Sequence, residues 1–110
     1  MSVFSRIINR ELPAKIAYED DKVIAIHDIA PMAPVHLLII PKKAYKCLQD
    51  IPENELSIVS HVVKIAQELA SEHEVTSSYR FLTNNGSDAG QTVFHLHFHL
   101  IGGQVLRHLC

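Results

Sequence analysis

The sequence predicts an α+β domain, with an antiparallel sheet of about five strands, one long helix over one face and one short helix. Three observations predict it. Short apolar runs are separated by turn residues, one long stretch has apolar residues at helical spacing, and a late run alternates histidine with apolar residues. The chain has 110 residues, so we expect a single domain over residues 1–110.

The first half of the chain is expected to hold the short helix and three strands. Ser2 is a candidate N-cap for the helix, and Pro13 ends it. The apolar run before Pro41 predicts a central strand because of its length and its β-branched residues. The predicted elements are a helix over Val3–Asn9 and strands at Ile16–Glu19, Lys22–Asp28 and His36–Ile40.

The second half of the chain is expected to hold the long helix and two more strands. Apolar residues recur every three or four positions in the helical stretch, and charged residues lie away from that stripe. The tripeptide 84–86 is a strong turn signal before a glycine-containing loop. The predicted elements are a helix over Pro52–His73 and strands at Tyr79–Thr83 and Val93–Ile101.

Composition excludes several classes of function. The chain is 47% hydrophobic with a formal net charge of −2, so it can build a core and lacks the basic surface of a general nucleic-acid binder. No apolar stretch approaches the roughly 20 residues that span a bilayer, and the start does not resemble a secretory signal. Cys47 and Cys110 form no CxxC pair, which favours a reducing compartment. We therefore expect a cytoplasmic protein with no nucleic-acid or membrane partner.

The run Val93–Leu100 carries the strongest chemical signal. On a strand, alternate side chains share a face, so one set enters the core and the other lines the opposite face. The core set is Phe94, Leu96, Phe98 and Leu100, and the opposite set is His95, His97 and His99. Three histidines on one face are costly to keep for structure alone, so a functional site is expected there.

Four interpretations of the three histidines compete. A purely structural trio is one of them, and a metal site is another, because His-x-His on a strand is a good zinc pair. However, His95 and His99 would lie about 13 Å apart at their backbones, and no acidic or cysteine partner stands at an obvious spacing. The third interpretation is nucleophilic and acid–base catalysis at phosphorus by neutral imidazole, and the fourth is binding of an anion without chemistry. We expect no metal and no cofactor.

The loop before this run favours the interpretations in which the site binds an anion. Its two glycines permit tight turns that point backbone N–H groups at one spot, and Gln91 and Thr92 would add donors. His36 would contribute a fourth imidazole from the central strand, or else be structural.

The stretch Gly90–Leu100 resembles the signature of the histidine triad (HIT) family. That signature has three histidines separated by apolar residues and preceded by Gly-Gln-Ser/Thr. The resemblance extends over nearly the whole chain, as a single HIT domain. It includes Phe4–Ile8, Glu11–Ala14, His27–Pro31, Ala33–His36 and Ile101–Gly103, and it points to the Hint-type branch, the purine nucleoside phosphoramidases.

The resemblance implies a homodimer whose sheets join edge to edge, and it assigns roles to residues. His97 would attack the α-phosphate of a purine nucleoside monophosphate derivative such as an AMP phosphoramidate. His99 would contact the phosphate, His95 and His36 would orient the site, and Asp28 would hold the ribose hydroxyls. The base pocket would be lined by Phe4, Ile26, His27 and Ile29. Contacts to the phosphate or the leaving group would come from Asn84, Gly90, Gln91 and Thr92.

Several of these residues have a simpler structural interpretation. Phe4 and Ile26 are also candidates for ordinary core, Asn84 for a turn residue, and Asp28 for a loop cap. Ala44 departs from the histidine that many Hint-type members carry there. The tail 107–110 lacks the aromatic and proline ending of some animal members, where it can reach the partner's site and influence the choice of leaving group. A diadenosine polyphosphate hydrolase and a non-catalytic nucleotide-binding protein remain alternative functions.

Overall fold

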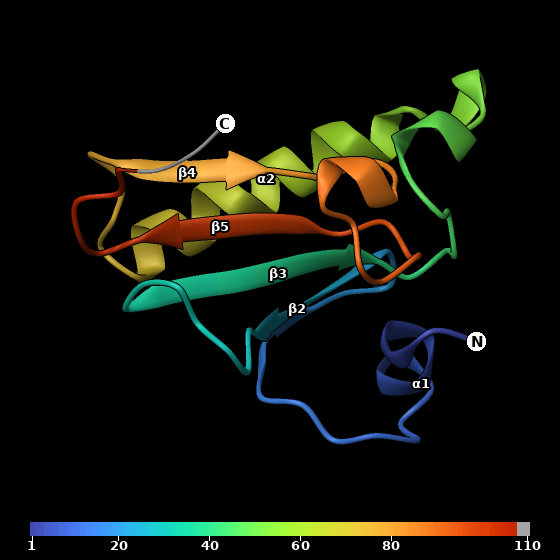
Figure 1. The fold of residues 1–110 in the computed structure, drawn as a ribbon, viewed down its shortest axis with the longest axis horizontal. Coiled ribbons are helices and arrows are strands. Elements are labelled where there is room, and N and C mark those ends of the chain that lie inside the picture. Colours follow the sequence, from blue (N-terminus) through green and yellow to red (C-terminus); the bar gives the residue numbers. More distant parts are fainter. Residues whose placement is uncertain (108–110) are drawn as a thin grey trace.

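Five strands form one antiparallel sheet in the order β1-β2-β3-β5-β4, as the prediction of an α+β fold required (Figure 1). The structure is a computed structural model and describes residues 1–107, so the end of the tail, 108–110, lies outside the described residues. The strands are β1 (Ile16–Glu19), β2 (Val23–His27), β3 (Val35–Pro41), β4 (Tyr79–Leu82) and β5 (Phe98–Gly102). The helices are α1 (Val3–Ile8) and α2 (Ser57–Glu72), with short 3-10 turns η1 (Leu48–Asp50), η2 (Glu53–Glu55) and η3 (Ser87–Ala89).

Local signals explain where the helices begin. The Ser2 hydroxyl accepts the N–H of Ser5 at 3.1 Å, so Ser2 caps α1 as predicted. The long helix begins at Ser57 and not at Pro52, because residues 53–55 form the separate turn η2. No helix within the described part of the chain is long and apolar enough to cross a membrane.

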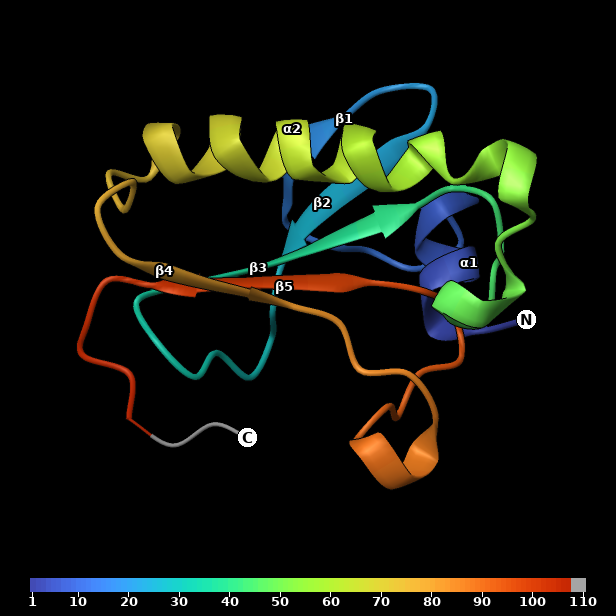
Figure 2. The ribbon, with the colours of Figure 1, turned by 90° about the horizontal axis from the view of Figure 1, so that it is seen from above.

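The sheet carries one core on each face. Alternate residues of β2 and β3 point to opposite sides, so Ala25 and Ile39 pack under α2 while Ile26 and Leu38 pack under α1. Figure 2 shows α2 running along one face, with the loop that contains η3 and the segment after β5 on the other side. Helix α1 therefore packs on the face of the sheet opposite α2.

The prediction of a strand over Val93–Ile101 is wrong for its first half. Strand β5 starts at Phe98, which pairs with Ile39 of β3, and in that register Leu96 would stand opposite Pro41. A proline has no N–H to donate to a ladder, so pairing stops there. The N–H of Leu96 bonds to the carbonyl of Tyr45 instead, at 2.7 Å.

Because strand β5 begins only at Phe98, the side chains before it do not alternate between the two faces as predicted. Phe94, which was expected in the core, is 52% exposed, whereas Leu96 and Phe98 are buried under α2 as predicted. The histidines do not line an open face either. His95 is only 1% exposed and His97 only 9% exposed, because α1 covers them.

Candidate functional site

A cavity of about 260 Å³ lies between α1 and the adjoining face of the sheet, next to the histidines. Its apolar lining comprises Val3, Phe4, Ile7, Ile26, Ile29, Leu38 and Val93, and its polar lining comprises His27, Asp28, Thr92, His97 and His99. An apolar cavity with a few convergent polar groups is the usual form of a small-molecule site.

Hydrogen bonding fixes which nitrogen of His97 is free. Nδ1 of His97 lies 2.8 Å from the carbonyl oxygen of His95. A carbonyl only accepts hydrogen bonds, so Nδ1 carries the proton of the neutral ring. The lone pair of His97 is therefore on Nε2, which is the arrangement that a nucleophile requires.

A second chain of hydrogen bonds fixes the tautomers of His36 and His99. The N–H of Met32 donates to Nδ1 of His36 at 3.1 Å, so the proton of the neutral His36 ring is on Nε2. That Nε2 lies 2.9 Å from Nδ1 of His99 and 3.3 Å from Oδ2 of Asp28. Nδ1 of His99 therefore accepts, and His99 carries its own proton on Nε2 as a donor for a ligand.

His95 is held away from the cavity. Its Nε2 donates to the carbonyl of Pro41 at 2.7 Å, and its Nδ1 lies 3.3 Å from the hydroxyl of Ser5. Both ring nitrogens are thus occupied by protein groups, so His95 can support the site but cannot touch a ligand in it.

Burial keeps all four imidazoles uncharged near neutral pH. Desolvation lowers the pKa of His36, His95 and His97 below its ordinary value. The pKa of His99 falls to about 4, first because of desolvation and then because of the neighbouring His97 and His36 rings. Those rings are close, with centroids 5.2 Å from His99 in each case.

Three backbone N–H groups of the loop before the histidines, which was expected to form an anion cradle, are used within the loop itself. The N–H groups of Ala89, Gly90 and Gln91 all donate to carbonyls within the loop, at 3.0 to 3.2 Å. The side chain of Gln91 is buried, and it accepts from Gly86 N and donates to the carbonyls of Lys46 and Val93. It therefore braces the loop and has no amide proton to spare for a phosphate.

The remaining loop residues lie at different distances from the cavity. Thr92 lines it, and Gly90 has φ +97°, a left-handed conformation that favours glycine. Asn84 does not line this cavity but a neighbouring one of about 430 Å³, which also reaches His99 and the segment 104–107. Of these loop residues, Thr92 lines the cavity, whereas Asn84, Gly90 and Gln91 do not.

The residues expected around a base do surround the cavity. The Phe4 ring meets the His97 ring edge to face, with centroids 4.9 Å apart. Ile26 is both core and cavity wall, and Ile29 stands at the rim with 99% exposure. His27 lines the cavity too, but its ring contacts His73 at the end of α2, with centroids 5.9 Å apart. The imidazole of His27 is therefore turned to the other face of the sheet.

The acidic partner that sequence spacing did not reveal is Asp28. Ligand atoms of Asp28, His36 and His99 lie within 4.8 Å of one another. An ion on Nε2 of His36 would leave the ring proton on Nδ1, directly facing the N–H of Met32. Histidines that bind metals normally donate their other N–H to an acceptor. Asp28, His36 and His99 therefore fit a chain of hydrogen bonds better than they fit a metal site.

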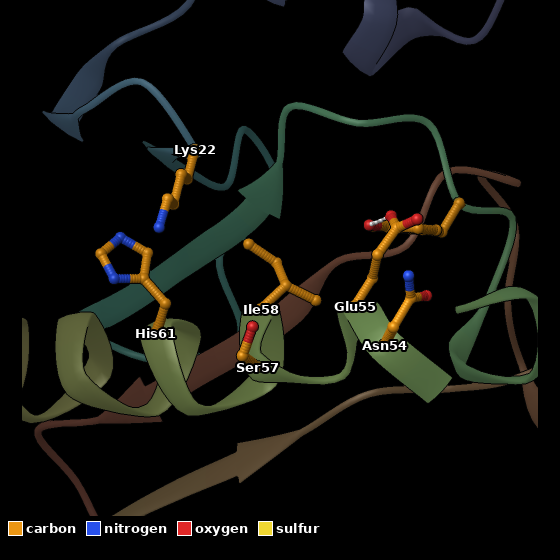
Figure 3. A pocket seen from close by; sticks show the side chains of 7 residues that line it. Lys22, Asn54, Glu55, Ser57, Ile58 and His61 are labelled. Atoms are coloured by element: carbon orange, nitrogen blue, oxygen red, sulfur yellow. Dashed lines mark hydrogen bonds between the residues drawn. The ribbon is translucent and has the colours of Figure 1, made fainter. Parts of the chain in front are cut away.

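Another polar pocket lies on the α2 side, and two of the side chains that line it, Glu55 and His61, are already held by other protein groups (Figure 3). Oε1 of Glu55 accepts from Lys43 Nζ and from the Tyr45 hydroxyl, both at 2.5 Å. His61, which also lines the pocket, bonds through Nε2 to Oδ2 of Asp20 at 2.7 Å. The cavity beside the histidines is therefore the better candidate site.

Sequence reasoning missed several contributors. Ile7, Leu38 and Val93 line the cavity, but in the sequence they are indistinguishable from ordinary core residues. The Thr83 hydroxyl donates to the carbonyl of His97 at 2.7 Å, a contact that only the pairing of β4 with β5 brings about.

Comparisons with known proteins agree with this geometry. The HIT domain family model matches residues 9–106. A HIT-like protein of Chlamydia pneumoniae is 48% identical over 106 residues, which are 96% of each chain. A HIT family hydrolase from Clostridium thermocellum has a TM-score of 0.93 at 48% identity, covering 98% of this chain and 95% of that one. A histidine triad nucleotide-binding protein from Candida albicans has a TM-score of 0.77 at 32% identity, covering 100% of this chain and 86% of that one. The chain therefore belongs to the HIT domain family.

Proposed function

We propose that this protein is a hydrolase that cleaves purine nucleoside phosphoramidates, in which an adenylyl or similar group is joined to an amine. The observation that carries the proposal is the tautomer of His97, whose Nε2 lone pair is free beside the cavity of about 260 Å³. The names of two similar proteins support the proposal: one is a HIT family hydrolase and the other is a histidine triad nucleotide-binding protein.

The reaction would proceed in two displacements. Nε2 of His97 attacks the α-phosphorus, a P–N bond to the ring forms, and the P–N bond to the amine breaks. The amine leaves after taking up a proton from solvent. Water then attacks the same phosphorus and gives up a proton to solvent, the bond to His97 breaks, and the nucleoside monophosphate leaves.

The neighbouring residues would bind and orient the substrate. The Nε2–H of His99 would donate to a phosphate oxygen, and the hydrogen bond from His36 holds that ring in the required tautomer. The carboxylate of Asp28 would accept from the ribose hydroxyls. The base would lie between Phe4 and Ile26, where the cavity is apolar.

Turnover of two substrates separates this function from its alternatives. An adenosine 5'-phosphoramidate is expected to be hydrolysed far faster than a dinucleoside polyphosphate, in excess chelator as well as without it. The reverse order would make the protein a dinucleoside polyphosphate hydrolase. AMP binding by calorimetry with no turnover of either substrate would make it a non-catalytic nucleotide-binding protein.

A further inference from the structure

The segment 93–97, which contains the proposed nucleophile, lies outside the sheet and is fastened by partners from elsewhere. On one side, the carbonyl of Pro41 at the end of β3 accepts from His95, and the carbonyl of Tyr45 in the connector after β3 accepts from Leu96. On the other side lies α1. Without ladder bonds, the position of His97 depends on these attachments and on the Thr83 hydroxyl, which donates to the carbonyl of His97.

The attachment to α1 is a compact cluster of three polar atoms. Nδ1 of His95 lies 3.3 Å from the Ser5 hydroxyl and 3.5 Å from the Ser2 hydroxyl, and the two hydroxyls are 3.3 Å apart. Because the Nε2–H of His95 is committed to Pro41, Nδ1 can only accept from a serine. A buried Nδ1 without that donor would be left unsatisfied.

The cluster is connected to His97 through a single residue. The carbonyl of His95 receives the Nδ1–H of His97, so the contacts that hold His95 also hold the acceptor that orients His97. The same helix places Phe4 against the His97 ring. Helix α1 and its cap therefore hold two residues of one short segment, His95 through polar contacts and His97 through an aromatic contact.

We propose that Ser2 and Ser5 are positioning residues of the active site, which orient His97 by holding the ring of His95. The kinetic part of this inference rests on the proposed function. Neither serine lines the cavity beside the histidines, so their loss should affect the chemical step more than the binding of the nucleotide.

Kinetics of serine variants test the proposal. Ser5→Ala keeps the Ser2 cap and should lower kcat about threefold, and Ser2→Ala/Ser5→Ala should lower it about tenfold or more. KM and the Kd for AMP should change less than about twofold in both. Ser5→Thr restores a hydroxyl and should restore kcat, and Ser60→Ala, on the exposed face of α2, is the matched control. A double variant with unchanged kcat, or with KM raised as much as kcat falls, would overturn the proposal.

A measurement without substrate distinguishes failure of this inference from failure of the proposed function. In long-range 1H–15N spectra, the Nδ1 resonance of His95 should move in Ser5→Ala and further in the double variant. The ring signals of His97 should move with it, while those of His61 should not. If the His97 signals stay in place in the double variant, the two serines do not position His97, whatever the protein hydrolyses.

Discussion

At the scale of single residues, hydrogen-bond partners give the four histidines of the site different roles. His97 has a free Nε2, His99 has a free Nε2–H, and His36 and His95 have both nitrogens engaged by the protein. The sequence pattern indicated that these histidines act together. It could not assign their tautomers, because the deciding partners are backbone groups of distant residues.

The pH dependence of kcat/KM should reflect the buried state of His97. Burial lowers its pKa below the ordinary value of about 6.5. The neutral nucleophile therefore persists as pH falls to that value, and kcat/KM should stay flat from pH 8 to about 6.5 and decline only below it. An acid limb centred above pH 7 would contradict a desolvated His97.

Asp28→Ala should weaken AMP binding much more than it weakens 2',3'-dideoxy-AMP binding. Hydrogen bonds to a carboxylate are each worth about 1.5–3 kcal/mol, which is about tenfold or more in Kd. Calorimetric titration of both nucleotides into both proteins measures the difference. Equal losses would mean that Asp28 acts through its structural contacts, since its Oδ1 also accepts from Ala30 N at 2.8 Å.

At the scale of elements, the sequence predicted which helices and strands exist better than it predicted where they end. The apolar periods of α2 and of β2 and β3 are local properties, and these elements appeared close to their predicted positions. The alternating run begins at Val93, five residues before the first paired residue of β5, Phe98. Strand pairing depends on the partner strand and not only on the alternating pattern. Pro41, in the partner strand, ends the pairing.

The turn between β1 and β2 should depend strongly on one carboxylate. Asp20 accepts from the N–H groups of Lys22 and Val23 and from the side chains of Tyr18 and His61, at 2.7 to 2.8 Å. Asp20→Asn places an amide against donors and should lower the free energy of unfolding by about 1–3 kcal/mol at pH 7. Urea denaturation measures this change, with the exposed neighbour Asp21→Asn as the control.

The same variant should show its effect only above the acid range. Burial alone would raise the pKa of Asp20, but hydrogen bonds from Val23 and Lys22 outweigh it and hold this pKa well below its usual value. A lowered carboxyl pKa gives stability that is present above the unfolded value of about 3.9 and is lost as pH falls further. A gap between wild type and Asp20→Asn that remained unchanged at pH 2 would contradict this account.

At the scale of the whole molecule, the two faces of the sheet have different tasks. The α2 face is a continuous apolar core, which composition and helical period predicted. The α1 face combines a smaller core with the cavity, and that arrangement depends on a six-residue helix meeting the ends of β2 and β5. Contacts between segments so far apart in sequence could be anticipated only from the family resemblance.

The proposed homodimer would extend the sheet at β4. The strand order leaves β1 and β4 as edges, and a free edge is a template for pairing. The cavity beside β4 also reaches His99, so a second copy at this edge would lie next to the site. Sedimentation equilibrium should give about twice the 12.4 kDa mass of one chain. A mass of one chain at micromolar concentration would contradict the dimer.

The measurement that tests the central claim most directly is the trapping of a nucleotidyl group on His97. A phosphorus–imidazole bond is stable in base and labile in acid. Mixing the protein with a phosphoramidate radiolabelled at the α-phosphate and quenching in alkali should therefore give labelled protein, and mild acid should release the label. His97→Ala should still bind AMP but never acquire the label. Label that persists in His97→Ala, or that maps by mass spectrometry to His95 or His99, would contradict the assignment of His97 as the nucleophile.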